Sequence, residues 1–293
     1  MPLTSGHHTG HVAAETGRRP GSGGATPAAR GGLELEDVSH WFTAKRGNTH
    51  VLDGCSFDVR EGEFVAVMGP SGCGKSTLIG FTAGFTKPSE GAVRWKGNPV
   101  GKPSVDKGVV FQKPSLYPWL DVWGNVMFGP RATGDAGNSE PWARQLLEEV
   151  GLDGFERHRP YELSGGMQHR VALVRTMVND PDLLLMDEPF AALDAQTRED
   201  MQELLVRVWE RHRRTVMFVT HDIEEGLLLA DRIVVLSARP AKVSAVVNVD
   251  FPRPRTYEIV MEPRFAELRR HVRELLNPGG APTPRGSLTG RSA

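Results

Sequence analysis

Short apolar runs alternate along the chain with longer segments in which apolar residues recur every three or four positions. The runs are aliphatic or β-branched and are bounded by polar residues or glycine, as buried strands are. A mostly parallel sheet covered by helices produces this alternation. The runs predict five strands, at 63–68, 108–111, 182–187, 215–220 and 232–236.

Two segments carry an apolar stripe at helical spacing. The first lies between the third and fourth predicted strands and predicts a crossover helix against the sheet; its stripe is Met201, Leu204, Leu205 and Val208. The second predicts a last helix that packs on the surface; its stripe is Phe265, Leu268, Val272 and Leu275.

Other regions depart from this rhythm. Residues 33–60 alternate as antiparallel strands do and predict a small β layer. Residues from about 113 to 165 have a polar, glycine-rich centre between helical flanks and predict a mainly helical subdomain inserted in the core. The expected fold is one α/β domain over 32–276, with a mostly parallel sheet. Segments 1–31 and 277–293 lack periodicity and are expected to be disordered tails.

Positive and negative side chains nearly balance, with 35 Lys and Arg against 36 Asp and Glu and a formal net charge of −1. Nucleic-acid binding usually needs a basic face, so a nucleic-acid partner is not expected. The only cysteines are Cys55 and Cys73, which fits a reducing compartment. No apolar run approaches the roughly 18 residues of a membrane span, and no signal peptide is evident. We expect a cytosolic chain whose membrane role, if any, comes from a partner.

The sequence GPSGCGKST at 69–77 matches the phosphate-loop pattern and lies between a predicted strand and a helix-forming segment. This motif predicts that the α/β core is that of a P-loop NTPase. Its backbone N–H groups would surround phosphate oxygens of ATP. Lys75 would neutralise the β- and γ-phosphates, Ser76 would bind Mg²⁺, and Thr77 would support the α-phosphate. The other loop residues expected to bind nucleotide are Gly69, Pro70, Ser71, Gly72, Cys73 and Gly74.

The apolar strand LLLMD ends in two acids, Asp187 and Glu188. A carboxylate at the carboxyl end of this strand would lie beside the phosphate loop. We expect Asp187 to hold Mg²⁺ through water, and Glu188 to polarise the water that attacks the γ-phosphate. The alternative, two solvated acids at a strand end, would be preferred only without the phosphate loop.

Two further polar residues close predicted strands. His221 follows TVMFVT and is expected to donate to the γ-phosphate, although a lone histidine is more often structural. Gln112 follows GVVF and is expected to reach the metal or the attacking water. Because Gln112 also begins the helical insertion, it is expected to report the state of the nucleotide to that insertion.

A second anion-binding turn, LSGGMQHR at 163–170, lies far from the phosphate loop in the sequence. Together with FQ at 111–112, LLLMDEP at 183–189, AALDA at 191–195 and VTHD at 219–222, the chain resembles the nucleotide-binding subunits of ATP-binding cassette transporters. The resemblance runs from about Leu33 to at least Ala241, with the motifs in the family's order.

The resemblance implies a head-to-tail dimer with two composite sites. Ser164, Gly165 and Gly166 of one subunit would meet the ATP on the phosphate loop of the other. Asp194 would lie in the loop that crosses the interface. No second phosphate loop occurs in the chain, so the partner is expected to be an identical or similar subunit.

The resemblance also implies that Phe42 stacks on adenine, with Trp41 as the neighbouring alternative and core packing as the third possibility. It places the groove for a transmembrane partner's cytoplasmic helix near Gln112. The apolar residues of this segment could contact such a helix, and the sequence alone allows equally that they belong to the core. They are Leu116, Tyr117, Trp119 and Leu120.

The sequence patterns PWL-x-V-x-x-NV and SARP-A-KV resemble those of the family branch that imports nitrate, sulfonates and taurine. An ATPase subunit on the cytoplasmic face of the membrane is therefore expected, with integral-membrane permease subunits and, indirectly, a periplasmic or extracellular solute-binding protein as partners. The alternatives are an exporter subunit and a soluble, non-transport ATP-driven clamp.

Overall fold

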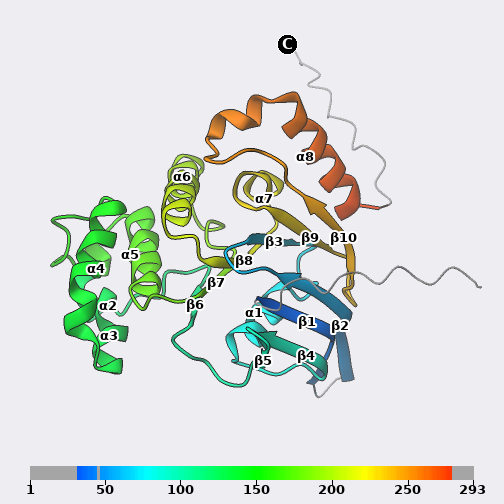
Figure 1. Cartoon of the computed structure of the whole chain (residues 1–293), viewed down its shortest axis with the longest axis horizontal. Coiled ribbons are helices and arrows are strands. Elements are labelled where there is room, and N and C mark those ends of the chain that lie inside the picture. Colours follow the sequence, from blue (N-terminus) through cyan, green and yellow to red (C-terminus); the bar gives the residue numbers. More distant parts are fainter. Residues whose placement is uncertain (1–31, 45–46, 279–293) are drawn as a thin grey trace, which may run out of the picture. The chain divides into compact units, whose positions relative to one another are not determined.

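The computed structural model describes residues 32–44 and 47–278. The two predicted tails lie outside these ranges, except for residues 277 and 278. Figure 1 shows two sheets, with helices on both faces of the larger one. Among the described residues, no helix combines the length and the apolar character needed to cross a bilayer.

The larger sheet has six strands in the order β10-β9-β3-β8-β7-β6. The five predicted strands form its parallel part, which confirms the α/β prediction, and β10 is antiparallel to β9 at one edge. We did not predict β10, because only one of its residues is fully buried and its pattern is weak. The strands are β3 (Phe64–Met68), β6 (Lys107–Val110), β7 (Leu183–Asp187), β8 (Thr215–Thr220), β9 (Arg232–Leu236) and β10 (Val243–Asn248).

The smaller sheet is antiparallel, in the order β2-β1-β4-β5. The predicted β layer over 33–60 is its β1-β2 hairpin, and a short hairpin after α1 completes it. The strands are β1 (Leu33–Ala44), β2 (Gly47–Val59), β4 (Glu90–Trp95) and β5 (Asn98–Pro99).

Alternate side chains of β3 point to opposite faces of the larger sheet, so the strand contributes to two separate hydrophobic clusters. Val65 and Val67 face one cluster, which α1 (Lys75–Ala83) fills from between the two sheets. Phe64 and Met68 face the other, which also includes buried residues of the helices after β6. The helices that follow β7 and contribute to it are α6 (Ala195–His212), α7 (Ile223–Leu229) and α8 (Pro263–Leu276), with the short 3₁₀ helix η2 (Tyr257–Met261) before α8.

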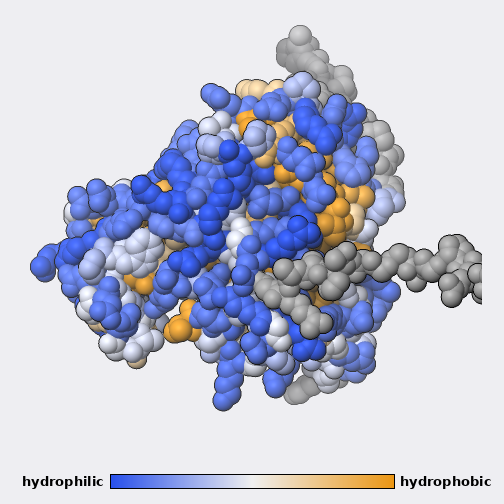
Figure 2. Space-filling view, in the orientation of Figure 1, coloured by the Kyte–Doolittle hydropathy of each residue, from blue (hydrophilic) through white to orange (hydrophobic). Residues whose placement is uncertain are grey.

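Both predicted helical stripes face this second cluster. The four stripe residues of α6 are buried, as are those of α8 except Leu275, which is partly buried. The face of the molecule in Figure 2 is mainly hydrophilic, with apolar residues gathered between α8 and β10. Val246 on β10 is among the exposed apolar residues, at 47%.

The segment after β6 is helical, as predicted, and appears in green at one side of Figure 1. Its helices are α2 (Val122–Val126), α3 (Phe128–Thr133), α4 (Ala136–Glu149) and η1 (Pro160–Glu162), followed by α5 (Gly165–Met177). Helix α5 contacts α2 and α4 on one side and β6 and α6 on the other. It therefore joins the helical segment to the sheet.

Candidate functional site

The phosphate loop connects β3 to α1 and depends on glycine at Gly74. This residue has a φ of 115°, in the left-handed region, immediately before the helix begins. A Cβ atom at Gly74 would lie 2.8 Å from side-chain atoms of Val51 and Leu52. The β2 strand therefore packs so tightly against the loop that only glycine fits.

The loop forms one wall of a hollow of about 230 Å³. Phe42, which is half-exposed, and the buried Val51 supply an apolar wall, and Glu188 and Arg239 supply charged groups. The hollow is lined by Phe42, Val51, Ser71, Gly72, Gly74, Lys75, Ser76, Thr77, Glu188 and Arg239. Predicted nucleotide-binding residues thus lie together around one open space.

The ammonium group of Lys75 is held inside the loop. Its Nζ donates to the backbone carbonyls of Gly69 and Pro70 at 2.9 and 3.2 Å, and the residue is only 5% exposed. It lies 3.9 Å from Oε1 of Glu188. A buried cation that is bound mainly to neutral carbonyls is well placed to attract an anion.

Ser76 and Asp187 meet at the carboxyl edge of the sheet. The Ser76 hydroxyl donates to Oδ1 of Asp187 at 3.0 Å. Burial raises the pKa of Asp187, and the charge of Glu188 raises it further, against the hydrogen bond from Ser76 and the charge of Lys75. A hydroxyl and a desolvated carboxylate are hard oxygen donors, so this pair suits Mg²⁺.

Glu188 turns away from Asp187 because its backbone has a φ of 46°. Its N–H donates to the Val219 carbonyl at 2.9 Å, which fixes it against β8. Its carboxylate lies 3.1 Å from Nδ1 of His221. The two neighbouring acids therefore point to different partners.

His221 lies at the end of β8, and its side chain is 59% exposed. The next residue, Asp222, accepts hydrogen bonds from the first N–H groups of α7, those of Glu224 at 2.8 Å and Glu225 at 3.4 Å. Behind His221, the Thr220 hydroxyl donates to Glu225. Helix α7 thus anchors the backbone that carries the histidine.

The adenine-stacking candidates point to different sides of β1. Trp41 stacks on His50, with ring centroids 4.5 Å apart and planes 11° apart. Phe42 lines the hollow and meets His40 edge-on at 4.7 Å. The geometry favours Phe42 as the base-stacking ring.

Gln112 does not join this cluster within the chain. Strand β6 ends at Val110, so Gln112 lies two residues beyond the strand that it was predicted to close. Its side chain is exposed and is not among those that line the hollow, while its carbonyl is 3.3 Å from Nε2 of His169.

The second anion-binding turn, called the signature turn below, also lies apart from the hollow. Ser164 caps α5 by accepting from the Met167 N–H at 3.3 Å, and both Ser164 and Gly165 are exposed. A Cβ at Gly166 would lie 2.5 Å from Cγ2 of Thr197, so the turn packs against the start of α6. The exposed Asp194 caps that helix and accepts from the Thr197 N–H at 3.1 Å.

Comparison with known proteins identifies the family. Residues 52–191 match the model described as ABC transporter. The chain is 45% identical over 83% of its length to an uncharacterised ABC transporter ATP-binding protein of Methanocaldococcus jannaschii, covering 91% of that protein. It is 46% identical over 84% of its length to the taurine import ATP-binding protein TauB of Rhizobium johnstonii, covering 96%. The chain belongs to the ABC transporter family.

Other comparisons agree with this assignment. The bicarbonate transport ATP-binding protein CmpD of Synechococcus elongatus is 41% identical over 83% of this chain and 90% of its own length. Among solved structures, the dimeric ATP-binding cassette MJ0796 bound to ADP and Pi is 29% identical, with a TM-score of 0.64 over 75% of this chain and 100% of that one. The chain is thus an ATPase of the ABC family with a cassette fold.

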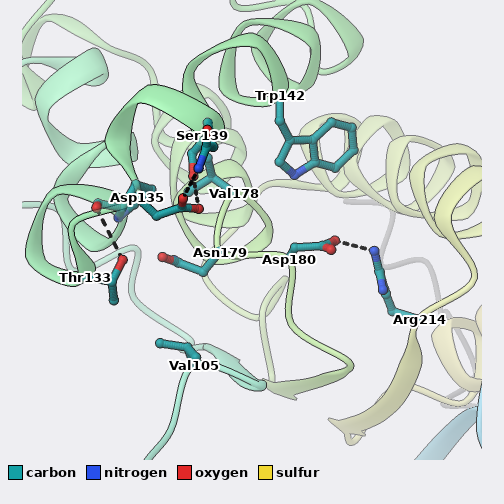
Figure 3. A pocket seen from close by; sticks show the side chains of 11 residues that line it. Val105, Thr133, Asp135, Ser139, Trp142, Val178, Asn179, Asp180 and Arg214 are labelled. Atoms are coloured by element: carbon teal, nitrogen blue, oxygen red, sulfur yellow. Dashed lines mark hydrogen bonds and ion pairs between the residues drawn. The ribbon is translucent and has the colours of Figure 1, made fainter.

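A wider hollow of about 640 Å³ lies elsewhere in this ABC ATPase (Figure 3). Asp135 and Trp142 line it from the helical segment, and Asp180 pairs with Arg214 on its other side. Asp180 and Arg214 precede β7 and β8, so this hollow lies at the amino ends of the strands. It contains no phosphate-loop residue and shares no lining residue with the hollow beside the phosphate loop.

Sequence reasoning missed two residues of the nucleotide hollow. Val51 belongs to no recognisable motif, and it lines the hollow only because β2 packs against the phosphate loop. Arg239 lies in the turn after β9, and the basic residue in SARP was the only available signal.

Proposed function

We propose that the chain is the ATP-hydrolysing subunit that powers an ABC importer for a small solute. The observation that carries the proposal is the cluster at the carboxyl edge of the sheet. There Glu188 lies between Lys75 and His221, and Asp187 bonds to Ser76 beside the phosphate loop.

The loop binds and orients the triphosphate. Ser71 to Gly74 and Thr77 present backbone N–H groups, Lys75 neutralises the terminal phosphates, and Phe42 stacks on the base. Ser76 and Asp187 would hold Mg²⁺, with Gln112 joining after the segment behind β6 moves inward. The bound ion would neutralise charge on the phosphate oxygens.

Glu188 acts as the general base. Its carboxylate is partly exposed to the hollow and is oriented by His221, so it can accept a proton from a water molecule directed at the γ-phosphate. His221 can donate to that phosphate once nucleotide is bound, and it keeps Glu188 in place before then.

A second copy of the chain completes the site. Ser164, Gly165 and the start of α5 are exposed, and no carboxylate among the described residues accepts a hydrogen bond from them. An exposed helix N-terminus with a serine cap suits a γ-phosphate held by a partner. Asp194 lies at the start of the adjacent α6 and would cross the same interface.

Exposed aromatic side chains near β6 suit a permease helix. Phe85 and Phe111 stack with centroids 6.2 Å apart, and they are 50% and 43% exposed. Tyr117 contacts Trp119 and Phe128, which are 66% and 44% exposed. Of the predicted contact residues, Leu116, Tyr117 and Leu120 are half-buried, while Trp119 is exposed. Such amphipathic rings commonly anchor protein interfaces.

Nitrate, sulfonates, taurine or a related small solute would be the cargo, delivered by a periplasmic or extracellular binding protein and carried by permease subunits. The chain would lie on the cytoplasmic face of the membrane. The relatives named for taurine and bicarbonate transport motivate this class of solute.

Affinity purification from detergent-solubilised membranes tests the proposal. An importer subunit would co-purify with an integral-membrane permease, and adding a solute-loaded binding protein to the reconstituted complex would stimulate ATP hydrolysis. An exporter would retain the permease without that stimulation. Recovery of the active chain with no membrane subunit would instead support a soluble ATP-driven clamp.

A further inference from the structure

Arg239 brings a second cationic side chain to the nucleotide hollow. It lies in the turn between β9 and β10 and lines the same space as Lys75 and Thr77. Its Nε donates to the carbonyl of Gly72 at 3.0 Å, and its Nη2 donates to the same oxygen. Among the described residues, no carboxylate pairs with it.

The turn that carries Arg239 is hydrogen-bonded to β2, which forms one wall of the hollow. The Ala241 N–H donates to the Val51 carbonyl at 2.8 Å, and the Asp53 N–H donates to the Ala241 carbonyl at 2.9 Å. Val51 itself lines the hollow. Arg239 is therefore held between the β2 wall and the outer side of the phosphate loop.

The remaining guanidinium donors have no protein acceptor among the described residues. Arginine has five N–H groups in a rigid planar fork, and one neutral carbonyl satisfies only part of them. A guanidinium at the rim of a phosphate-binding loop matches the charge and geometry of phosphate oxygens.

The strand order fixes the side from which Arg239 approaches. Strand β9 lies on one side of β3, whereas β8 and β7, which carry His221 and Glu188, lie on the other. Arg239 therefore reaches the loop from the side opposite the hydrolytic pair.

We propose that Arg239 binds the non-transferred phosphates of the nucleotide, so that it sets the affinity for ATP and ADP alike. This inference rests on the proposed nucleotide site and adds a phosphate-binding residue to it. Arg239 contributes to binding in the ground state and the transition state equally, so its removal raises KM more than it lowers kcat.

The test uses Arg239→Gln, which removes the charge and keeps a donor for the Gly72 carbonyl. We expect the Kd values for ADP and for ATP to rise by about tenfold each, because hydrogen bonds to charged groups contribute at this scale. Titration calorimetry should show unchanged adenosine binding, and the ADP affinity of the variant should depend less on salt. KM for ATP should rise by about tenfold, while kcat falls less than threefold. Arg239→Lys should recover part of the lost affinity.

Lys242→Gln is the matched control, because Lys242 is a cation of the same turn that pairs with Asp53 at 2.9 Å and does not line the hollow. It should leave ADP affinity unchanged. An ADP affinity of Arg239→Gln equal to the parent's, or a loss confined to kcat, would overturn the proposal. Lys75→Ala separates the two levels of inference: full ADP binding by that variant would refute the nucleotide site itself.

Discussion

At the scale of single residues, backbone conformation separates the roles of two adjacent acids. Asp187 continues the extended strand and meets Ser76, whereas the left-handed backbone of Glu188 directs its carboxylate to His221. Left-handed conformations are uncommon outside glycine, and the surrounding structure must maintain them. Here the Val219 carbonyl and His221 hold Glu188 in that conformation.

Glu188→Gln should lower ATP hydrolysis by about 100-fold or more, because the amide cannot accept the proton from the attacking water. Nucleotide binding should persist, since Lys75 and the loop backbone are unchanged. Phosphate release and ADP titration measure the two effects. Glu203→Gln, an exposed change on α6, is the control. Turnover equal to the parent's would remove Glu188 from the role of base.

Glu225 should make stability depend on pH. Burial raises its pKa to about 7, despite the hydrogen bond from Thr220. Its folded pKa thus exceeds its unfolded value, so its contribution to stability is present below pH 4.5 and is lost as the pH rises through 7. From pH 5 to 8 the parent should lose about 2.5 kcal/mol relative to Glu225→Gln. Denaturant unfolding of both proteins at the two pH values measures this, and parallel pH profiles would contradict it.

At the scale of elements, a buried arginine ties the chain after β10 to the end of α7. Arg255 is 4% exposed and donates to the carbonyls of Ala230 at 2.7 Å and Val249 at 2.9 Å. Burial, together with the charge of Arg253, lowers its pKa to about 10. Because α7 also begins at the His221 turn, this contact braces the helix that anchors the histidine.

Arg255→Gln should destabilise the nucleotide-free protein by about 3 kcal/mol or more, because it leaves several buried carbonyls without donors. Thermal and denaturant unfolding measure the loss. Arg273→Gln, an exposed change on α8, is the control and should leave stability within about 0.5 kcal/mol of the parent's. Equal stability of the two variants would show that the brace contributes little.

At the scale of the whole molecule, the phosphate loop and the signature turn occupy different surfaces. Phosphate-loop residues line the hollow beside Glu188, whereas Ser164 and Gly165 are exposed at the start of α5. One chain therefore presents two partial anion sites. A symmetric pair of copies can join them into two complete ones.

Gly165→Glu should block ATP-driven dimerisation without disturbing the isolated chain. A Cβ at Gly165 meets no atom within 4 Å, so the side chain should fit the monomer, but its charge should repel a partner's triphosphate. Light scattering with ATP, in the Glu188→Gln background, should show a dimer that the added change abolishes. Intact ATP binding by the monomer is the control, and a persistent dimer would contradict the half-site arrangement.

The sequence by itself determined the parallel strands and the phosphate loop, because apolar runs and closely spaced glycines encode them locally. The two adjacent acids at the carboxyl end of an apolar run also indicated that Asp187 and Glu188 lie at the site. Weakly patterned edge strands such as β10 escaped prediction, since exposed positions place few constraints on side chains.

Only the tertiary structure decided which residues from distant segments share the nucleotide hollow. Alternation along β1 puts Trp41 and Phe42 on opposite faces, but packing selects the face that meets the loop. Arg239 and Gly72 are 167 residues apart in the sequence, and they meet because β9 lies beside β3 in the sheet. Gln112 remains exposed because β6 ends two residues before it. Such proximities depend on the pairing of the strands, which local sequence patterns do not specify.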